Sequence, residues 1–189
     1  MKADDRETRV AAILELLEHA RGSDYIGEGV SQLEHALQAA SLARAAGAPD
    51  SEILAALLHD VGHLCAGPDA PSMDGLGVVR HESIGAAYLE SLGMDPRIAE
   101  LVRGHVDAKR YLVGADPRYA ARLSDASRET LRHQGGAMSD REQRAFEALP
   151  RHRALLRVRC WDEAAKEPGR SVEPLAAYAS LLRDHLRAR

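Results

Sequence analysis

Nine histidines stand in this chain of 189 residues, and several of them, with two acids, have the types and spacing of metal ligands. Each of these histidines falls in a separate stretch with helical periodicity, near its middle or its end. Imidazole and carboxylate together are ligands that iron, manganese and zinc accept. Helices packed side by side can direct such groups into a shared core cavity. The candidate ligands are His35, His59, Asp60, His81, His105 and Asp162.

The adjacent pair His59-Asp60 carries the strongest signal. It ends the run 53–58, which is apolar on every side and is therefore expected to be buried. Burying an imidazole and a carboxylate is costly unless they are paired or bind a metal. Adjacent side chains on a helix diverge by about 100°, so the imidazole can serve one metal while the carboxylate bridges two. Four other histidines are expected to be surface or structural residues: His19, His133, His152 and His185.

Polar side chains at helical spacing predict a substrate pocket next to the metal ligands. Lys109 lies four residues after His105, and an ammonium there suits a phosphonate or phosphate oxyanion. The alternative for Lys109 and Arg159 is a solvated helix face. Further polar residues share helix faces in the same way, and they could also form an exposed face. They are His63, Ser127, Thr130 and Gln134.

The composition predicts an all-α fold that positions these groups. Aromatic residues make up only 4%, so the core must be built from Leu, Ala, Val and Ile, which favours packed helices. Ser31 and Glu34 match a capping box, and Asp50 or Ser51 can cap the next helix. The loop 64–77 precedes the fourth helix. The expected helices are 4–20, 32–46, 52–63, 79–92, 95–110, 117–134, 140–164 with a break at Pro150, and 173–188.

Charge and composition exclude several classes of protein. A net charge of −4 disfavours a general nucleic-acid binder, which needs a basic face. Two cysteines are too few for a disulfide scaffold or a Cys-rich zinc site. No stretch approaches the roughly 20 apolar residues of a membrane span, and the charged start does not match a signal peptide. We therefore expect one cytoplasmic domain, residues 1–189, without membrane or nucleic-acid partners.

The pattern of ligands resembles the HD-domain superfamily of metal-dependent phosphohydrolases, and His81 and His105 resemble the two added histidines of its dinuclear members. Further segments resemble one branch, the mixed-valent di-iron HD oxygenases that cleave carbon–phosphorus bonds. These segments are Asp24-Tyr-Ile-Gly-Glu28, Gln32-Leu-Glu-His35, Leu58-His-Asp-Val-Gly-His63, Gly104-His-Val-Asp-Ala-Lys-Arg-Tyr-Leu112, Leu123-Ser-Asp-Ala-Ser-Arg-Glu-Thr-Leu131, Gln134-Gly-Gly136 and Arg159-Cys-Trp-Asp-Glu163. The resemblance spans nearly the whole chain.

The resemblance implies an HD-domain helical bundle with two iron ions in its core, one Fe(II) and one Fe(III). One iron would be held by His35, His59, Asp60 and Asp162. Asp60 would bridge to a second iron, held by His81 and His105. Oxygen would be the co-substrate. The reaction would cleave a 1-hydroxy-2-aminoethylphosphonate into glycine and phosphate, or its N-trimethyl analogue into glycine betaine and phosphate.

The resemblance also assigns roles around the metals. Tyr25 would ligate iron until substrate displaces it, and Glu28 would contact the substrate amine. A carboxylate favours a primary amine, which has N–H groups to donate, although it also attracts a trimethylammonium group. The phosphonate and hydroxyl would be surrounded by His63, Lys109, Ser127, Thr130, Gln134 and Arg159. Two alternatives are a dinuclear phosphohydrolase, which has the same ligand set, and a degenerate binding module, which the complete ligand set disfavours.

Overall fold

The computed structural model describes residues 2–25 and 27–187, and in that part of the chain it contains helices and isolated β-bridges but no strand. The predicted all-α fold class is confirmed. Ile26, within the motif 24–28, lies outside the described residues. The helices are α1 (Lys2–His19), η1 (Ala20–Gly22), α2 (Gln32–Ala45), α3 (Asp50–Leu58), α4 (Val61–Cys65), α5 (His81–Ser91), α6 (Pro96–Ala115), α7 (Pro117–Arg122), α8 (Asp125–His133), α9 (Asp140–Glu147), α10 (His152–Ala164), η2 (Leu175–Tyr178) and α11 (Ala179–His185).

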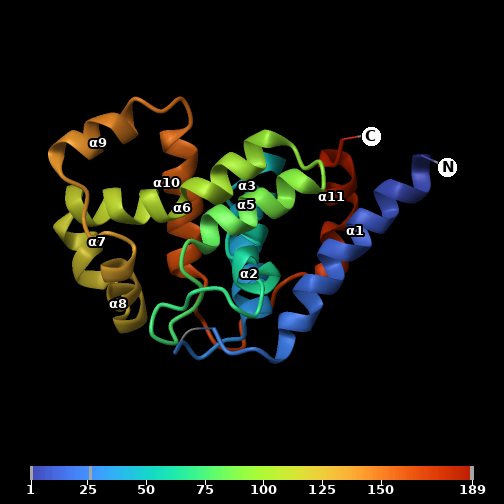
Figure 1. The fold of residues 1–189 in the computed structure, drawn as a ribbon, viewed down its shortest axis with the longest axis horizontal. Helices are drawn as coiled ribbons and strands as arrows, with labels where there is room; N and C mark the ends of the chain where they lie inside the picture. Colours follow the sequence, from blue (N-terminus) through green and yellow to red (C-terminus); the bar gives the residue numbers. More distant parts are fainter. Residues whose placement is uncertain (1, 26, 188–189) are drawn as a thin grey trace.

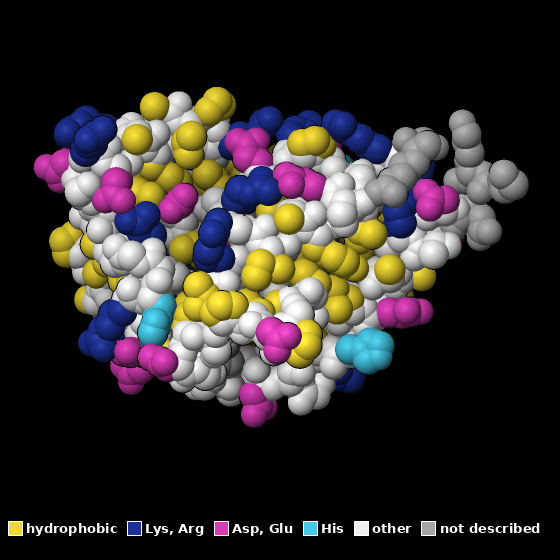
Figure 2. All heavy atoms as spheres, in the orientation of Figure 1, with side chains coloured by type: hydrophobic (Ala, Val, Ile, Leu, Met, Phe, Trp, Pro, Cys, Tyr) yellow, Lys and Arg dark blue, Asp and Glu magenta, His cyan; other side chains and the backbone are white. Residues whose placement is uncertain are grey.

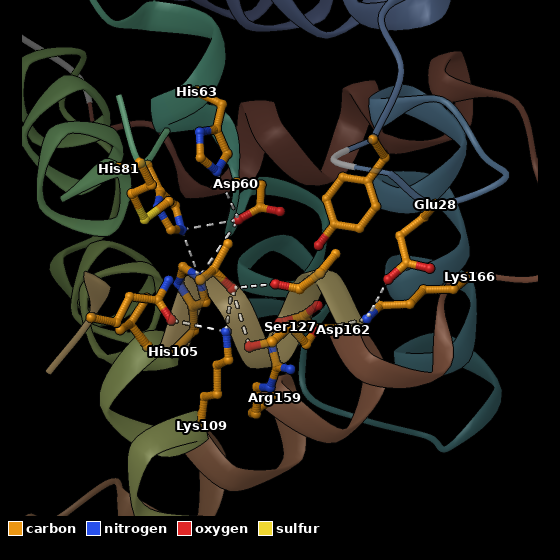
Figure 3. Close-up of a pocket in the computed structure, with 16 residues that line it drawn as sticks. Glu28, Asp60, His63, His81, His105, Lys109, Ser127, Arg159, Asp162 and Lys166 are labelled. Atoms are coloured by element: carbon orange, nitrogen blue, oxygen red, sulfur yellow. Dashed lines mark hydrogen bonds and ion pairs between the residues drawn. The ribbon is translucent and has the colours of Figure 1, made fainter. Parts of the chain in front are cut away.

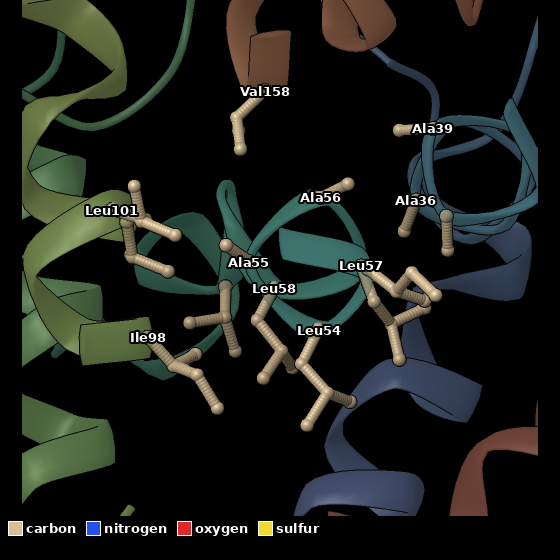
Figure 4. Packing of buried hydrophobic residues seen from close by; sticks show 14 of the residues in the cluster. Ala36, Ala39, Leu54, Ala55, Ala56, Leu57, Leu58, Ile98, Leu101 and Val158 are labelled. Carbon is tan, nitrogen blue, oxygen red and sulfur yellow. The ribbon is translucent and has the colours of Figure 1, made fainter. Parts of the chain in front are cut away.

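The apolar helix α3 lies at the centre of the bundle, as its composition predicts. It packs against α2, α6, α10 and α11. Leu54 and Leu58 are fully buried there, with Ala36 and Ala39 of α2 on one side and Ile98 of α6 on the other (Figure 4). Removing this apolar area from water stabilises the fold by about 25 cal/mol per Å². The buried end of α3 therefore places His59 and Asp60 inside the protein.

The remaining elements extend from this centre in two directions (Figure 1). At one end α7, α8 and α9 follow the long helix α6, and at the other end α1 packs against α11. Two loops, 23–31 and 66–80, lie together below α2 and close one side of the bundle. Elements from the whole length of the chain thus surround the end of α3.

Local sequence signals are confirmed at some helix ends and wrong at others. Ser31 and Glu34 form the predicted capping box of α2. The N-cap of α3 is Pro49, so neither Asp50 nor Ser51 caps that helix. Ser124 caps α8 and separates it from α7, so the predicted helix 117–134 is two helices. The predicted helix 95–110 continues to residue 115 because Asp116 and Pro117 end it.

The predicted helix 52–63 is also wrong, and this correction matters for the site. α3 ends at Leu58, and Asp60 adopts φ −99° and ψ 7°, outside the helical range, before α4 begins at Val61. The backbone therefore bends at the His59-Asp60 pair. His59 and Asp60 therefore do not lie on one continuous helix, as the sequence analysis expected; the bend sets the directions of their side chains.

The surface carries charges of both signs. On the face drawn in Figure 2, Lys and Arg side chains alternate with Asp and Glu, with apolar atoms between them. No helix in the described part of the chain is long and apolar enough to cross a bilayer.

We predict that Gly62→Ala strongly destabilises the protein, because α4 and α5 are in backbone contact at this glycine. A Cβ at Gly62 would lie 1.9 Å from the His81 carbonyl oxygen, which cannot move without displacing α5. The expected loss is about 3 kcal/mol in the free energy of unfolding, measured by urea denaturation. Gly67→Ala is the control, because nothing lies within 4 Å of a Cβ there. Equal stability of the two variants would contradict this contact.

Candidate dinuclear metal centre and substrate pocket

Three buried side chains from distant elements form the first candidate metal cluster. The Nδ1–H groups of His35 and His59 donate to the carbonyls of Ala165 and Ala56, each at 2.8 Å. In the neutral tautomers that make these bonds, both Nε2 atoms are acceptors, and they face each other at 3.0 Å. Asp162 adds its Oδ1, which lies 3.4 and 3.6 Å from these nitrogens and accepts no hydrogen bond from any residue that the structure describes.

A second cluster lies beside the first and is formed by His81, His105 and Asp60. His105 donates from Nδ1 to the Val102 carbonyl at 2.8 Å, and its Nε2 lies 3.1 Å from Nε2 of His81. Burial, followed by the neighbouring His81 and His59, lowers the pKa of His105 to about 3. This imidazole is therefore neutral at ordinary pH, the form that binds metals.

Asp60 connects the two clusters. Its Oδ2 lies 3.3 Å from His59 Nε2 and 3.8 Å from His35 Nε2. Its Oδ1 lies 3.2 Å from His81 Nε2 and 3.6 Å from His105 Nε2. The bend after α3 turns the carboxylate so that each oxygen faces one pair of imidazoles. This is the arrangement of a carboxylate that bridges two metal ions.

The donor set fits two bound cations. In each cluster two imidazole nitrogens and a carboxylate oxygen converge, and where their lone pairs face one another they repel unless a proton or a metal cation lies between them. The ligand atoms of each cluster lie within 4.8 Å of one another. Nitrogen and oxygen ligands without thiolate suit iron, manganese or zinc. The structure thus brings together all six residues that the sequence predicts as ligands.

A cavity of about 40 Å³ opens beside the clusters (Figure 3). It is lined by every predicted site residue except His35 and His59, which lie behind it. It also contains residues that the sequence analysis missed. The complete lining is Tyr25, Glu28, Asp60, His63, Met73, His81, His105, Val106, Lys109, Ala126, Ser127, Thr130, Gln134, Arg159, Asp162 and Lys166.

Lys109 provides a buried positive charge in this cavity. Its ammonium donates to Thr130 Oγ1 at 2.7 Å and to Gln134 Oε1 at 2.9 Å. Burial, followed by the charge of Arg159, lowers the pKa of Lys109 to about 7. No carboxylate in the described part of the chain forms an ion pair with it. The alternative of a solvated face is therefore wrong for Lys109, and its amine, when protonated, is available to an anion.

Arg159 is equally buried, but its donors are already used. It pairs with Asp162 and Glu163 and donates to the hydroxyl of Tyr119 at 2.7 Å. Because Arg159 binds the Oδ2 of Asp162, the Oδ1 of that carboxylate is directed at the first cluster. The alternative of a solvated face is thus wrong for Arg159 too. Its guanidinium contacts Asp162, one of the candidate metal ligands.

Three predicted site residues line the cavity on its other side. His63 accepts the Val78 N–H at Nδ1, so its Nε2 carries the proton and is a donor. Burial, followed by His81, lowers the pKa of His63 to about 3. The ring of Tyr25 stacks on His35, with centroids 3.8 Å apart. Burial raises the pKa of this tyrosine well above its usual value. Glu28 presents a carboxylate, labelled in Figure 3.

Four residues of the lining escaped sequence reasoning for different reasons. Lys166 lies four residues after Asp162, so its spacing could have suggested a shared face, although α10 ends at Ala164. Met73, Val106 and Ala126 carry no chemical signal, because apolar residues are usual in any core. The four histidines expected elsewhere, at 19, 133, 152 and 185, lie outside both clusters.

An all-helical fold with two adjacent His/Asp clusters is typical of a metal-dependent enzyme, and comparisons with known proteins identify the family. The profile of the HD domain matches residues 32–159, which include every residue of the two clusters except Asp162. The chain belongs to the HD domain family.

Its relatives include two enzymes. Over 143 residues, 76% of this chain and 72% of the relative, it is 43% identical to 1-hydroxy-2-(trimethylamino)ethylphosphonate dioxygenase (glycine-betaine-forming) of Leisingera caerulea. Over 171 residues, 90% and 84% of the two chains, it is 39% identical to hydroxymethylphosphonate dioxygenase of Gimesia maris. An uncharacterized protein of Acanthamoeba polyphaga mimivirus is 43% identical over 178 residues, which cover 94% of this chain and 81% of the viral protein. The resemblance to HD-domain phosphonate dioxygenases, predicted from the sequence, is confirmed.

We predict that Asp60→Asn lowers the metal content from two ions per chain to one or none, because a neutral amide cannot hold two cations together. Metal content is measured by elemental analysis after purification with iron. Asp69→Asn, an exposed change outside both clusters, is the control and should retain two ions. Two ions retained in Asp60→Asn would contradict a bridging role.

Proposed function

We propose that this protein is an iron-dependent oxygenase that uses O2 to cleave the carbon–phosphorus bond of a 1-hydroxyphosphonate. The proposed substrate is 1-hydroxy-2-aminoethylphosphonate, converted to glycine and phosphate. One substrate molecule and one O2 contain all atoms of the two products, so no other reductant is needed. The names of two relatives, both phosphonate dioxygenases, support this class of reaction.

One observation carries the proposal. Asp60, shared between two imidazole pairs, faces the same cavity as Lys109, whose charge no described carboxylate neutralises. A bridged pair of metals next to a free cation suits a small anion that also offers a metal-binding oxygen. A 1-hydroxyphosphonate has both features.

The proposed cofactor is a mixed-valent pair of iron ions. His35, His59 and Asp162 would hold one ion, His81 and His105 the other, with Asp60 between them. When bound, the pair would act as Lewis acid toward the substrate oxygens and supply the redox chemistry for O2.

The residues of this chain would bind and orient the substrate. Lys109 Nζ would pair with the phosphonate, and the hydroxyls of Ser127 and Thr130 and the amide of Gln134 would donate to it. His63, which carries its proton on Nε2, would donate to a substrate oxygen near Asp60. Fixing the reacting carbon in this way lowers the entropic part of the barrier.

Two residues of the loop 23–31 complete the proposed site. Tyr25, stacked on His35, would cover the first metal position until substrate enters. Glu28 would receive the substrate amine, because its buried Oε1 accepts no hydrogen bond within the described residues. A primary ammonium can donate to this oxygen, whereas a trimethylammonium group has no N–H to offer.

We also propose that the described chain acts as one domain. α1 and α11 pack against each other, and both contact the central elements, α1 through α4 and α11 through α3. The HD profile therefore covers most of the proposed site within a single core, and Tyr25, Glu28 and Asp162 lie just outside the profile. A cytoplasmic location stays a prediction from the sequence.

The decisive experiment measures phosphate release by iron-loaded protein from 1-hydroxy-2-aminoethylphosphonate, its N-trimethyl analogue and hydroxymethylphosphonate, with and without O2. We expect phosphate and the matching carboxylic acid only under air, with one O2 consumed per phosphate. A phosphate monoester is the control substrate. Equal phosphate release without O2, or turnover of the ester alone, would instead identify a dinuclear phosphohydrolase.

We predict that Lys109→Met raises KM for the hydroxyphosphonate by about 100-fold, since a buried charge-assisted contact to an anion is worth about 3 kcal/mol. Steady-state kinetics at several substrate concentrations measure the change. Arg110→Met, the next residue, is the control: its guanidinium pairs with Glu142 on the surface. An unchanged KM in Lys109→Met would remove this lysine from the phosphonate site.

A further inference from the structure

Lys166 lies at the end of the cavity that holds Glu28, and the proposed function gives it no task. Its ammonium is 3.2 Å from Glu28 Oε1 and 3.1 Å from Glu163 Oε1. It also donates to Ser127 Oγ at 3.0 Å and Ser124 Oγ at 3.2 Å. Both charged ends of the Glu28–Lys166 pair are directed at each other in Figure 3. The pair thus occupies the place next to the proposed phosphonate site.

The contact with Glu28 differs from the others that Lys166 makes, because it is an ion pair without a hydrogen bond. The Glu28 Oε1 atom is buried and forms no hydrogen bond within the described residues, so the ammonium is close but poorly aligned. The other three oxygens around Lys166 each accept a hydrogen bond from it. Lys166 can therefore release Glu28 and keep its remaining partners.

Glu28, in contrast, depends on Lys166 for charge balance. Lys166 is its one ion-pair partner in the part of the chain that the structure describes. Glu163 is also paired with Arg159, so it keeps a cation if Lys166 moves. The Glu28 side chain is only 16% exposed, and a carboxylate with so little contact with water is stabilised by a positive charge near it. Any molecule that separates Glu28 from Lys166 must therefore bring a cation of its own.

We propose that Lys166 determines substrate specificity as an internal counter-ion of Glu28, replaced by the substrate ammonium when the substrate has one and kept when it has none. This inference rests on the proposed function and deepens it. With a phosphonate that lacks an amine, Lys166 remains paired and shields the anion from the Glu28 charge. With an aminophosphonate, the substrate ammonium replaces Lys166 as the partner of Glu28. The site can therefore bind phosphonates with an amine and phosphonates without one.

The proposal predicts opposite effects of removing the two partners. In Lys166→Met, Glu28 is left uncompensated, so the preference for an amine-bearing ligand should rise about tenfold. In Glu28→Gln, the preference should fall by a similar factor, about tenfold. Lys166→Arg keeps the charge and should stay near the wild-type preference. Arg170→Met, an exposed cation that pairs with Glu167, is the matched control.

The preference is measured by binding, independently of turnover. Calorimetry on iron-loaded protein without O2 compares Kd for 2-aminoethylphosphonate with Kd for ethylphosphonate, which differ by the ammonium. A ratio in Lys166→Met equal to that of the wild type, or a change as large in Lys166→Arg, would overturn the proposal. If Lys166→Met fails to fold by circular dichroism, Lys166→Gln and Glu28→Gln provide the same comparison.

The same variants separate this inference from the proposed function. Steady-state kcat/KM for 1-hydroxy-2-aminoethylphosphonate and for hydroxymethylphosphonate should change in the same direction as the Kd ratio. If the wild type cleaves neither compound under air, the proposed function fails, while the Kd ratio still decides on Lys166. If cleavage proceeds and both ratios are unchanged in Lys166→Met, the counter-ion role alone fails.

Discussion

The carboxylate of Asp60 faces four imidazole nitrogens, and the positions of the other site residues depend on this contact. The nitrogens are the Nε2 atoms of His35, His59, His81 and His105. Each pair of Nε2 atoms lies at hydrogen-bond distance. Backbone carbonyls accept from Nδ1 of His35, His59 and His105, so the neutral forms of these three have no proton at Nε2 to share. Such an arrangement is unfavourable in a dry core unless positive charge lies between the nitrogens. The buried helix α3, the bend after it and the histidines on α2, α5 and α6 all serve to hold this contact together.

Charge in the cavity follows from the same constraint. One of the carboxylates that face the clusters, Asp162, is balanced from behind by Arg159, which also pairs with Glu163. Lys109 is left with neutral partners, and Glu28 with a single lysine, among the residues that the structure describes. Within that part of the chain, the cavity therefore offers a free cation and a loosely paired anion on either side of the candidate metals, a distribution that suits a small zwitterion.

Sequence reasoning succeeded where the signal is local or where a chemical pattern is compatible with few kinds of site. The capping box at Ser31 depends on residues three apart, and the burial of α3 depends on its uniform apolar composition. The His59-Asp60 pair at the end of that helix indicated a metal site because isolated burial of both groups is too costly. The structure brings the six predicted ligands together, and their roles as ligands stay a prediction.

The sequence by itself determined the all-helical class, the set of candidate ligands and the chemistry they can support, since these depend on residue type and short-range spacing. Only the tertiary structure decided which oxygen of Asp60 faces which pair, that Arg159 is used up by carboxylates, and that Lys166 contacts Glu28. These contacts join residues from separate elements, and the bend at Asp60 orients its carboxylate between them. The packing of distant helices supplies the free energy that stabilises these contacts and the bend. The local sequence does not show which helices will pack together.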